Sequence, residues 1–270
     1  MRASAPASSA NLGPGFDCLA LALDLQCTVE VSPATDWNVG PVDPGGFVES
    51  AARRLSESPL TVEVTSDIPV GRGLGSSAAV LAALTLAIWR HQGKPDDQES
   101  LFRSVAGAEG HPDNAAAAVY GGLVYSDSRA TRRLEFHKSW RPVVAVPDVA
   151  LSTPEARAAL PASLPIEVAV RTAARLVRLV EGLRTGDTDL LRSIDADELH
   201  EPHRIALRPV IGKLLDAVRA AGAPFAAISG SGPSVIALTT GGEFEEVAAA
   251  LRSIESVEVV APSVSTLGAS

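Results

Sequence analysis

The sequence predicts an α+β fold of two lobes, and three observations support this prediction. A strand-like run, Leu60–Val64, and a helix-like run, Ala78–Trp89, flank a glycine-rich loop. Past the middle of the chain, short alternating segments give way to longer helices. The elements there follow the order β-α-α-β-β-α-β, which favours a small antiparallel sheet with helices on one face. We place the lobe boundary near Trp140, between residues 1–140 and 141–270.

The first lobe is expected to combine strands, helices and glycine turns. Residues 2–32 predict two strands around the turn Ser8–Asp17, whose Gly-Pro-Gly continues neither strand nor helix. Helices are expected where apolar residues recur at helical spacing and Gly or Pro follows. The further elements are a loop at Asp36–Gly46, helices at Phe47–Leu55, from Ser77 to Gly93, from Asp96 or Asp97 to about Glu109 and at Asp113–Tyr120, and strands at Leu60–Val64, Leu123–Ser126 and Arg133–Lys138.

The second lobe is expected to begin with a strand and to be mostly helical up to its central hairpin. Its predicted strands are Pro142–Val146, Phe225–Ile228, Val235–Thr239 and Val257–Ala261. Its predicted helices are Thr153–Leu160, Pro165–Arg184, Asp189–Ile194, Pro209–Ala221 and Glu243–Ile254.

Composition narrows the class of function. The 270 residues are 46% hydrophobic and 20% charged, as in ordinary globular proteins. A net charge of −9 argues against a nucleic-acid partner, although local arginines still allow a small anionic substrate. Cys18 and Cys27 fit reduced, small apolar side chains rather than a disulfide framework. The N-terminus has no signal-peptide pattern, and the longest apolar run falls short of the roughly 20 residues that cross a bilayer. We therefore expect a cytosolic protein without a membrane partner; a homodimer is left open.

The glycine-rich loop is the strongest chemical signal. It reads Pro69-Val70-Gly71-Arg72-Gly73-Leu74-Gly75-Ser76-Ser77. Alternating glycines let backbone N–H groups approach a ligand, and a helix that starts at the serines turns its positive end toward the loop. Both features suit phosphate. The serine hydroxyls are expected to cap the helix, to coordinate a metal, or both. The loop is neither a P-loop nor a dinucleotide fingerprint, and taken alone it also fits an ordinary glycine turn.

The order of residues in this loop resembles the phosphate-binding motif of the GHMP small-molecule kinases. Five other segments resemble motifs of the homoserine kinases within that family. The six segments are Pro6–Asp17, Ile68–Ala79, Glu109–Asn114, Ser152–Arg157, Leu199–Arg204 and Ser229–Ser234. The resemblance covers nearly the whole chain. It implies the two-lobed GHMP kinase fold, with a first lobe like domain 2 of ribosomal protein S5, a ferredoxin-like second lobe and the site between them.

The resemblance implies ATP and Mg²⁺ as cofactors. Residues Pro69–Ser77 would bind ATP, and Ser77 and Glu109 would hold the metal, because Mg²⁺ needs few protein oxygens and keeps several waters. Arg72 either adds charge to the phosphates or points to solvent. Glu109 at a helix end also fits a surface carboxylate. The family's asparagine segment near the adenine has no match at Asp43–Phe47, so no adenine contact is assigned.

The resemblance also implies L-homoserine as substrate, an amino acid whose side chain ends in a hydroxyl. Carboxylate recognition suits arginine, and ammonium recognition suits carboxylates. The implied substrate-binding residues are Asn11, Asp17, His111, Asp113, Arg157, Arg204 and Gly230, and the implied catalytic residues are Asn11, Glu109 and Asn114. The substrate-binding residues also allow a purely structural interpretation. Asn11 and Gly230 would be turn residues, and Asp17 and Asp113 would be caps. His111 would be a loop histidine with its hydrogen bonds satisfied, and the two arginines would lie on the surface.

The implied reaction is transfer of phosphate from ATP to the homoserine hydroxyl, a step toward threonine. No side chain is assigned as general base, so we expect positioning and charge neutralisation to dominate. Two alternatives stay open. One is a GHMP kinase for another small carboxylated alcohol such as mevalonate, which lacks the amine that paired aspartates would bind. The other is a catalytically silent nucleotide- or amino-acid-binding homologue, whose expected mark would be loss of Glu109 or Ser77.

Overall fold

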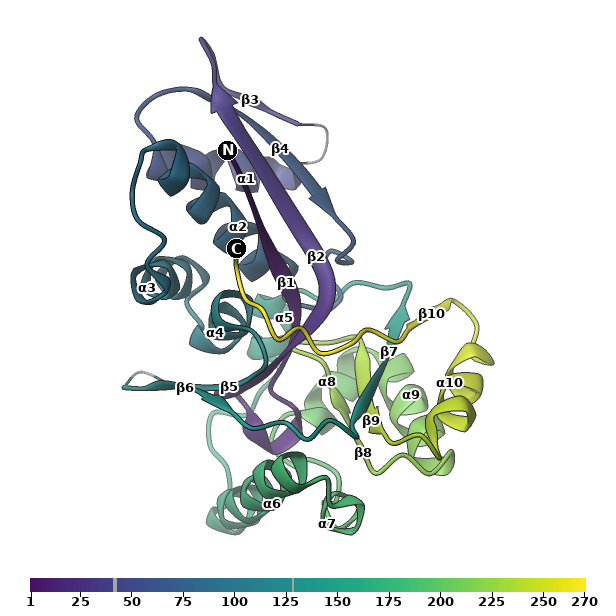
Figure 1. Cartoon of the computed structure of the whole chain (residues 1–270). Coiled ribbons are helices and arrows are strands. Elements are labelled where there is room, and N and C mark those ends of the chain that lie inside the picture. The colour runs from purple at the N-terminus through teal and green to yellow at the C-terminus, as the bar shows by residue number, and fades with distance from the viewer. Residues whose placement is uncertain (41–42, 128) are drawn as a thin grey trace.

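The computed structural model describes residues 1–40, 43–127 and 129–270 and has two lobes, each built on one sheet (Figure 1). The first sheet follows the order β3-β4-β2-β5-β6, with β1 paired to β2 outside this path. Its strands are β1 (Arg2–Ala10), β2 (Leu19–Pro33), β3 (Asn38–Val39), β4 (Leu60–Ser66), β5 (Leu123–Ser126) and β6 (Thr131–Leu134). The helices of this lobe are η1 (Gly13–Gly15), η2 (Pro44–Gly46), α1 (Phe47–Leu55), α2 (Ser76–His91), α3 (Gln98–Glu109) and α4 (Pro112–Tyr120).

The long helix α2 lies on β1 and β2 and forms the centre of the first core. Its residues from Ala78 to Ile88 are all buried, and many are alanine. Short side chains let the helix approach the sheet closely, so this core needs few aromatic residues. The packing fixes the start of α2, where the glycine-rich loop ends.

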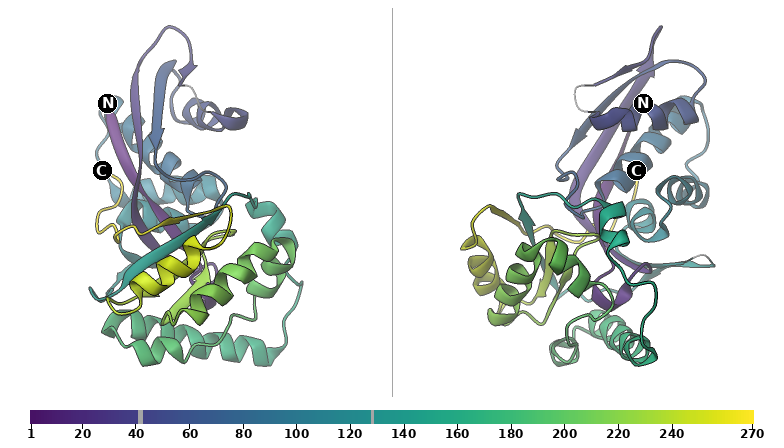
Figure 2. Two further views of the ribbon diagram at one scale, coloured as in Figure 1. Left: turned by 90° about the vertical axis from the view of Figure 1, so that its right-hand side faces the viewer. Right: turned by 180° about the vertical axis from the view of Figure 1, so that it is seen from behind.

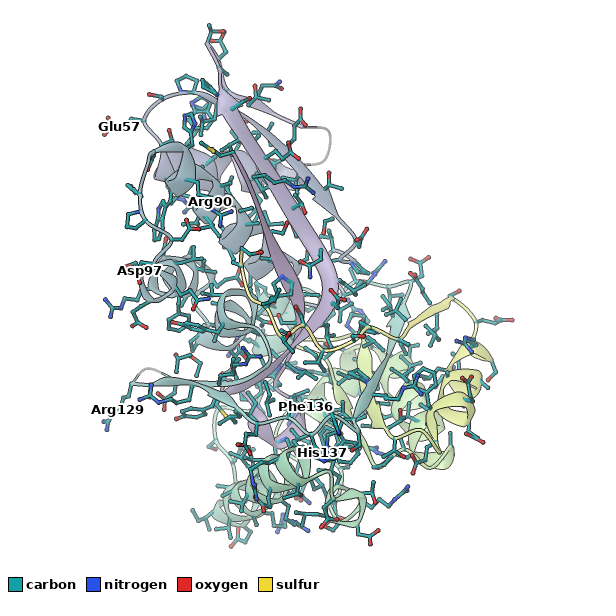
Figure 3. All side chains as sticks on the ribbon, in the orientation of Figure 1. Glu57, Arg90, Asp97, Arg129, Phe136 and His137 are labelled. Atoms are coloured by element: carbon teal, nitrogen blue, oxygen red, sulfur yellow. The ribbon has the colours of Figure 1, made fainter. Side chains whose placement is uncertain are left out.

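Helix α3 begins where the sequence predicts it. Asp97 lies at the start of the helix (Figure 3), where its carboxylate accepts a hydrogen bond from the backbone N–H of Ser100 at 3.2 Å and so caps the helix. Gly110, in the left-handed conformation, ends it. These two signals place Glu109 in the last turn of α3.

The second lobe is a four-stranded antiparallel sheet in the order β10-β7-β9-β8. Its strands are β7 (Arg141–Pro147), β8 (Phe225–Ile228), β9 (Val235–Thr239) and β10 (Val257–Val260). Its helices are α5 (Thr153–Ala158), α6 (Ile166–Thr185), α7 (Thr188–Arg192), α8 (Glu201–Leu207), α9 (Pro209–Ala220) and α10 (Phe244–Arg252). The predicted two-lobed α+β class is confirmed, and Trp140 directly precedes β7.

Both faces of the second sheet are buried. Helices α9 and α10 pack against one face (Figure 2), where Val143 and Ala145 join their core. The alternate residues Val144 and Val146 belong to the core of the first lobe. The two lobes therefore share a continuous apolar contact through β7.

The chain after β10 returns to the first lobe, as the yellow end of the ribbon shows (Figure 1). The N–H of Ser265 donates to the carbonyl of Ala22 at 3.1 Å, and Ser4 and Ser270 exchange backbone hydrogen bonds of 2.8 and 2.9 Å. This segment ties the end of the second lobe to β1 and β2. No helix of the described residues has the length and apolar character needed to cross a membrane.

Two sequence predictions are wrong in detail, and one helix was not predicted. The predicted strand Arg133–Lys138 ends at Leu134, because Leu134 already pairs with Leu123, the first residue of β5. The predicted loop Asp36–Gly46 contains the short strand β3, paired in parallel with β4; residues 41 and 42 of that loop lie outside the described residues. Helix α8 had not been predicted, although Pro202 in its first turn suits a helix start.

Candidate active site

The glycine-rich loop connects β4 to α2 and follows a backbone path that only glycine adopts easily. Gly71, Gly73 and Gly75 have φ of 69°, 76° and 67°. The N-cap of α2 is Gly75 rather than a serine, and no side chain caps the helix. The predicted capping by Ser76 or Ser77 is therefore wrong, because the left-handed glycine occupies the cap position and both serines lie in the first turn. Their hydroxyls are not used as caps.

Two other segments enclose this loop. A Cβ at Gly73 would lie 2.2 Å from the carbonyl oxygen of Ser229, and one at Gly75 would lie 2.0 Å from Ser8 Oγ. Ser229 Oγ donates to the Gly73 carbonyl at 2.7 Å, and the Ser8 N–H donates to the Leu74 carbonyl at 3.0 Å. The loop thus lies between the end of β1 and the turn Ser229–Ser234 of the second lobe.

Ser77 and Glu109 meet at the start of α2, as the sequence suggested. Ser77 Oγ donates a hydrogen bond to Glu109 Oε1. Burial raises the pKa of Glu109, an effect that the hydrogen bond from Ser77 opposes. One carboxylate and one hydroxyl match the oxygen ligands that Mg²⁺ takes from proteins. Among the described residues, no three His, Cys, Asp or Glu side chains gather into a metal site.

Arg157 from α5 reaches across to the first lobe and pairs with Asp17. Its two terminal nitrogens donate to the two carboxylate oxygens at 2.6 and 3.1 Å, which is a bidentate ion pair. Its Nε donates to His111 Nε2 at 3.0 Å. Since His111 Nδ1 lies 2.5 Å from the Gly110 carbonyl, the proton belongs on Nδ1 and the ring is neutral. Three predicted residues far apart in sequence therefore form one cluster.

Arg204 lies beside this cluster and is almost fully buried, with 2% of its surface exposed. Its Nη1 donates to the Gly230 carbonyl at 2.7 Å, and Asn11 Nδ2 donates to the same oxygen at 2.6 Å. Burial and the nearby charge of Arg157 lower the pKa of Arg204 to about 10. Its Nε is buried without a hydrogen-bond partner among the described residues. A buried donor without an acceptor is costly, so this atom is available to an anionic ligand.

Asp113 and Asn114 open helix α4 between the two groups. Asp113 is buried, and burial together with the charge of Asp17 raises its pKa. Its Oδ1 accepts from the backbone N–H of Asn114 at 2.7 Å, and the Asn114 amide oxygen accepts from Ser8 Oγ at 2.8 Å. Asp113 is not the helix cap, which is His111. The plain capping interpretation of Asp113 is therefore not supported.

The remaining loop residues point elsewhere. Arg72 pairs with the exposed Asp148 at 3.0 Å, and Val70 is exposed. Sequence reasoning passed over Phe16, whose ring lies 5.7 Å from the Arg157 guanidinium and 5.5 Å from that of Arg204. It also passed over the buried His200, which touches Arg204. Both residues occur inside the segments singled out above, which was the signal available.

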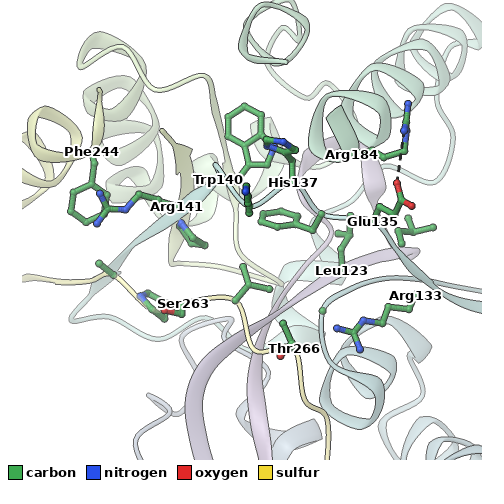
Figure 4. A pocket seen from close by; sticks show the side chains of 18 residues that line it. Leu123, Arg133, Glu135, His137, Trp140, Arg141, Arg184, Phe244, Ser263 and Thr266 are labelled. Carbon is green, nitrogen blue, oxygen red and sulfur yellow. Dashed lines mark ion pairs between the residues drawn. The ribbon is translucent and has the colours of Figure 1, made fainter. Parts of the chain in front are cut away.

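A separate groove of about 900 Å³ opens between β5–β7 and the chain after β10 (Figure 4). Arg141 lies 4.1 Å above the Phe244 ring at its rim, and Arg184 lies 3.8 Å from Glu135. None of the predicted site residues is among its described lining residues. The groove is distinct from the convergence of loops described above.

Comparison with known proteins finds relatives that match most of the chain. A family model described as the N-terminal domain of GHMP kinases matches residues 46–122, and one described as the GHMP kinase C terminus matches 179–255. The chain is 38% identical to the homoserine kinase of Thermus thermophilus over 268 residues, covering 94% of this chain and 91% of that one.

Solved structures give the same picture. The structure of homoserine kinase from Cytophaga hutchinsonii matches with a TM-score of 0.87 and 28% identity, covering 100% of this chain and 96% of that one. Mevalonate kinase from Methanococcus jannaschii matches with a TM-score of 0.74 and 16% identity over 98% of both chains. At that identity the likeness concerns the fold alone.

Proposed function

The chain belongs to the homoserine kinases of the GHMP kinase family, and we propose that it transfers the γ-phosphoryl group of ATP to the side-chain hydroxyl of L-homoserine. The products are O-phospho-L-homoserine and ADP. The main structural support for this proposal is the position of the turn Ser229–Ser234. The turn Ser229–Ser234 contacts the glycine-rich loop at Gly73 and, at Gly230, accepts hydrogen bonds from Asn11 and Arg204. A phosphate site and an amino-acid site at this turn would adjoin.

The nucleotide phosphates would lie against Pro69–Ser77. Backbone N–H groups of the loop and the first turn of α2 donate to anions, and the helix dipole favours negative charge there. Because a side chain at Gly73 or Gly75 would overlap neighbouring atoms, the loop can hold this path only with glycine.

Mg²⁺ would be held by Ser77 Oγ and Glu109, with phosphate oxygens and water as the other ligands. The two protein oxygens already contact each other, and the half-buried Glu109 carboxylate forms no ion pair with a cationic side chain of the described residues. When bound, the cation supplies neutralisation of charge on the transferring phosphoryl group. The role of the chain is to fix these two oxygens beside the phosphate loop.

The amino-acid end of homoserine would bind at the Asp17–Arg157 cluster. Its ammonium would contact Asp17 and Asp113, and its carboxylate would contact Arg157 and the unpartnered Nε of Arg204. A zwitterion brings one positive and one negative charge. The Asp17–Arg157 ion pair could therefore be replaced by two ion pairs, ammonium with Asp17 and carboxylate with Arg157, without a change in the net charge of the site. This charge balance favours an α-amino acid over a carboxylic acid without an amine, such as mevalonate.

Catalysis would rest on positioning. Asn11 has one amide hydrogen and one lone pair left after its backbone contacts, enough to orient the hydroxyl. Asn114 would support the site through its contact with Ser8. His111 Nε2 already accepts from Arg157, so it is not a free base. The reaction would proceed by in-line alignment and charge neutralisation.

The test is ADP release with a panel of alcohols in the presence of ATP and Mg²⁺. ADP should form with L-homoserine and not with mevalonate, shikimate or galactose. A matched substrate lacking the carboxylate, 3-amino-1-propanol, should also fail. Robust turnover of mevalonate without turnover of homoserine would refute the proposal.

A further inference from the structure

We infer that His200 is a positioning residue, which holds the Arg204 guanidinium in the orientation that receives the substrate carboxylate. The inference rests on the proposed function, in which Arg204 binds that carboxylate. His200 itself is fully buried and contacts Arg204 through a hydrogen bond.

The hydrogen bonds of His200 fix its tautomer. Its Nε2 lies 3.0 Å from the Gly13 carbonyl oxygen, which can only accept, so Nε2 carries the proton. Its Nδ1 lies 3.2 Å from Arg204 Nη1, which can only donate, so Nδ1 carries the lone pair. A neutral imidazole satisfies both partners. Burial lowers the pKa of His200 to about 4, so the ring keeps this form at neutral pH.

The same contacts constrain Arg204 from two sides. Its Nη1 donates both to Nδ1 of His200, four residues earlier in the chain, and to the Gly230 carbonyl in the turn Ser229–Ser234. Because Nη1 donates to two acceptors, the guanidinium cannot turn without losing a hydrogen bond. Its Nε has no partner among the described residues. Without the histidine acceptor, Nη1 would keep a single partner.

His200 is itself firmly anchored. Asp197 Oδ2 accepts from the backbone N–H groups of His200 and Glu201 at 2.6 and 3.0 Å. The imidazole packs against Phe16 with 5.1 Å between ring centroids. Through Gly13 it joins α8 to the turn that also carries Asn11 and Asp17. The site thus gains one rigid connection between the substrate arginine and the first lobe.

Two substitutions separate the two nitrogens of His200. In His200→Asn the amide oxygen lies about where Nδ1 was, so an acceptor for Arg204 remains and the Gly13 bond is lost. In His200→Gln the terminal nitrogen lies about where Nε2 was, so the Gly13 bond remains and the acceptor for Arg204 is lost. Both variants lose the ring and one hydrogen bond, and each is therefore the control for the other.

Steady-state kinetics with ATP and L-homoserine gives the readout. His200→Gln should raise KM for homoserine roughly tenfold or more, as expected for a lost hydrogen bond to a charged group, and leave KM for ATP near wild type. His200→Asn should raise KM for homoserine less than about threefold. In an Arg204→Ala background, His200→Gln should cause no further rise, because His200 acts through the arginine.

Equal effects of the two substitutions, or a full additional effect in the Arg204→Ala background, would overturn the inference and leave a purely structural histidine. A rise of more than about tenfold in His200→Asn would overturn it even if His200→Gln does not fold. Absence of homoserine turnover by the wild type would instead refute the proposed function, and this inference with it.

Discussion

Replacing Glu109 by glutamine should abolish most of the activity without lowering stability. Glutamine has nearly the same shape and still accepts a hydrogen bond from Ser77, so the end of α3 should fold as before. What is lost is one negative charge beside the phosphate loop. Comparable losses of electrostatic stabilisation cost about 3–4 kcal/mol, which corresponds to a fall in kcat of roughly 150- to 900-fold.

The stability of the same variant should move in the opposite direction. Burial raises the pKa of Glu109 above its ordinary value of 4.5. The folded protein therefore binds more protons than the unfolded chain between these two pKa values, and its stability falls as pH rises through that range. Glutamine has no such proton equilibrium, so above this range Glu109→Gln should unfold at an equal or higher temperature than the wild type in the absence of metal and nucleotide.

Two assays decide the matter: kcat at saturating Mg²⁺, ATP and homoserine, and thermal unfolding of the free protein. Glu99→Gln is the matched control, because Glu99 is an exposed residue of the same helix and its loss changes the net charge equally. The control should keep wild-type kcat. If Glu109→Gln retains more than half of the wild-type kcat, the metal-binding role is wrong. If it unfolds at a clearly lower temperature, the reasoning from the raised pKa is wrong.

Three further substitutions test other parts of the site. Gly73→Ala should reduce both stability and activity, because its Cβ would lie 2.2 Å from the Ser229 carbonyl oxygen at a φ of +76°; normal unfolding temperature and kcat would contradict this. Arg204→Ala should lower kcat/KM for homoserine by roughly 30-fold to several thousand-fold, as expected from about 2–5 kcal/mol for a desolvated charge contact, and leave the Kd for ATP unchanged by calorimetry. Glu201→Gln should remove a pH dependence: burial raises the pKa of Glu201 from 4.5 to about 7, so its contribution to wild-type stability is present below pH 4.5 and is lost as pH rises through 7, by about 3 kcal/mol. The free energy of unfolding, measured with denaturant at pH 5 and at pH 8, should fall more in the wild type than in Glu201→Gln. An equal fall in both proteins would contradict this reasoning.

Local signals in the sequence were enough to predict most elements. Asp97 and Gly110 marked both ends of α3, and Phe47–Leu55 was predicted with the bounds it has as α1. The segments that resemble the homoserine kinases also contained the residues that converge in the structure. Cap and turn chemistry depends on neighbours in the chain, which is why it could be read without the fold.

The partners across the site could not be predicted in the same way. Asp17 and Arg157 are separated by 140 positions, and each had been expected to contact the substrate rather than the other. The capping role left open for the serines of α2 is wrong, because the left-handed Gly75 is the cap and a side chain there would overlap Ser8. Such pairings follow from tertiary packing, to which propensity gives no access.

The contact between the glycine-rich loop and the turn Ser229–Ser234 limits how the two lobes can be recombined. A Cβ at Gly230 would lie 2.8 Å from the Gly73 carbonyl oxygen, just as one at Gly73 would overlap Ser229. Each backbone path is thus shaped to the other, although one belongs to the first lobe and the other to the second. A chimaera that joined the first lobe of this chain to the second lobe of a distant GHMP kinase would keep the glycine-rich loop but lose the turn that fits against it. A graft that takes both loops from one parent would preserve this match.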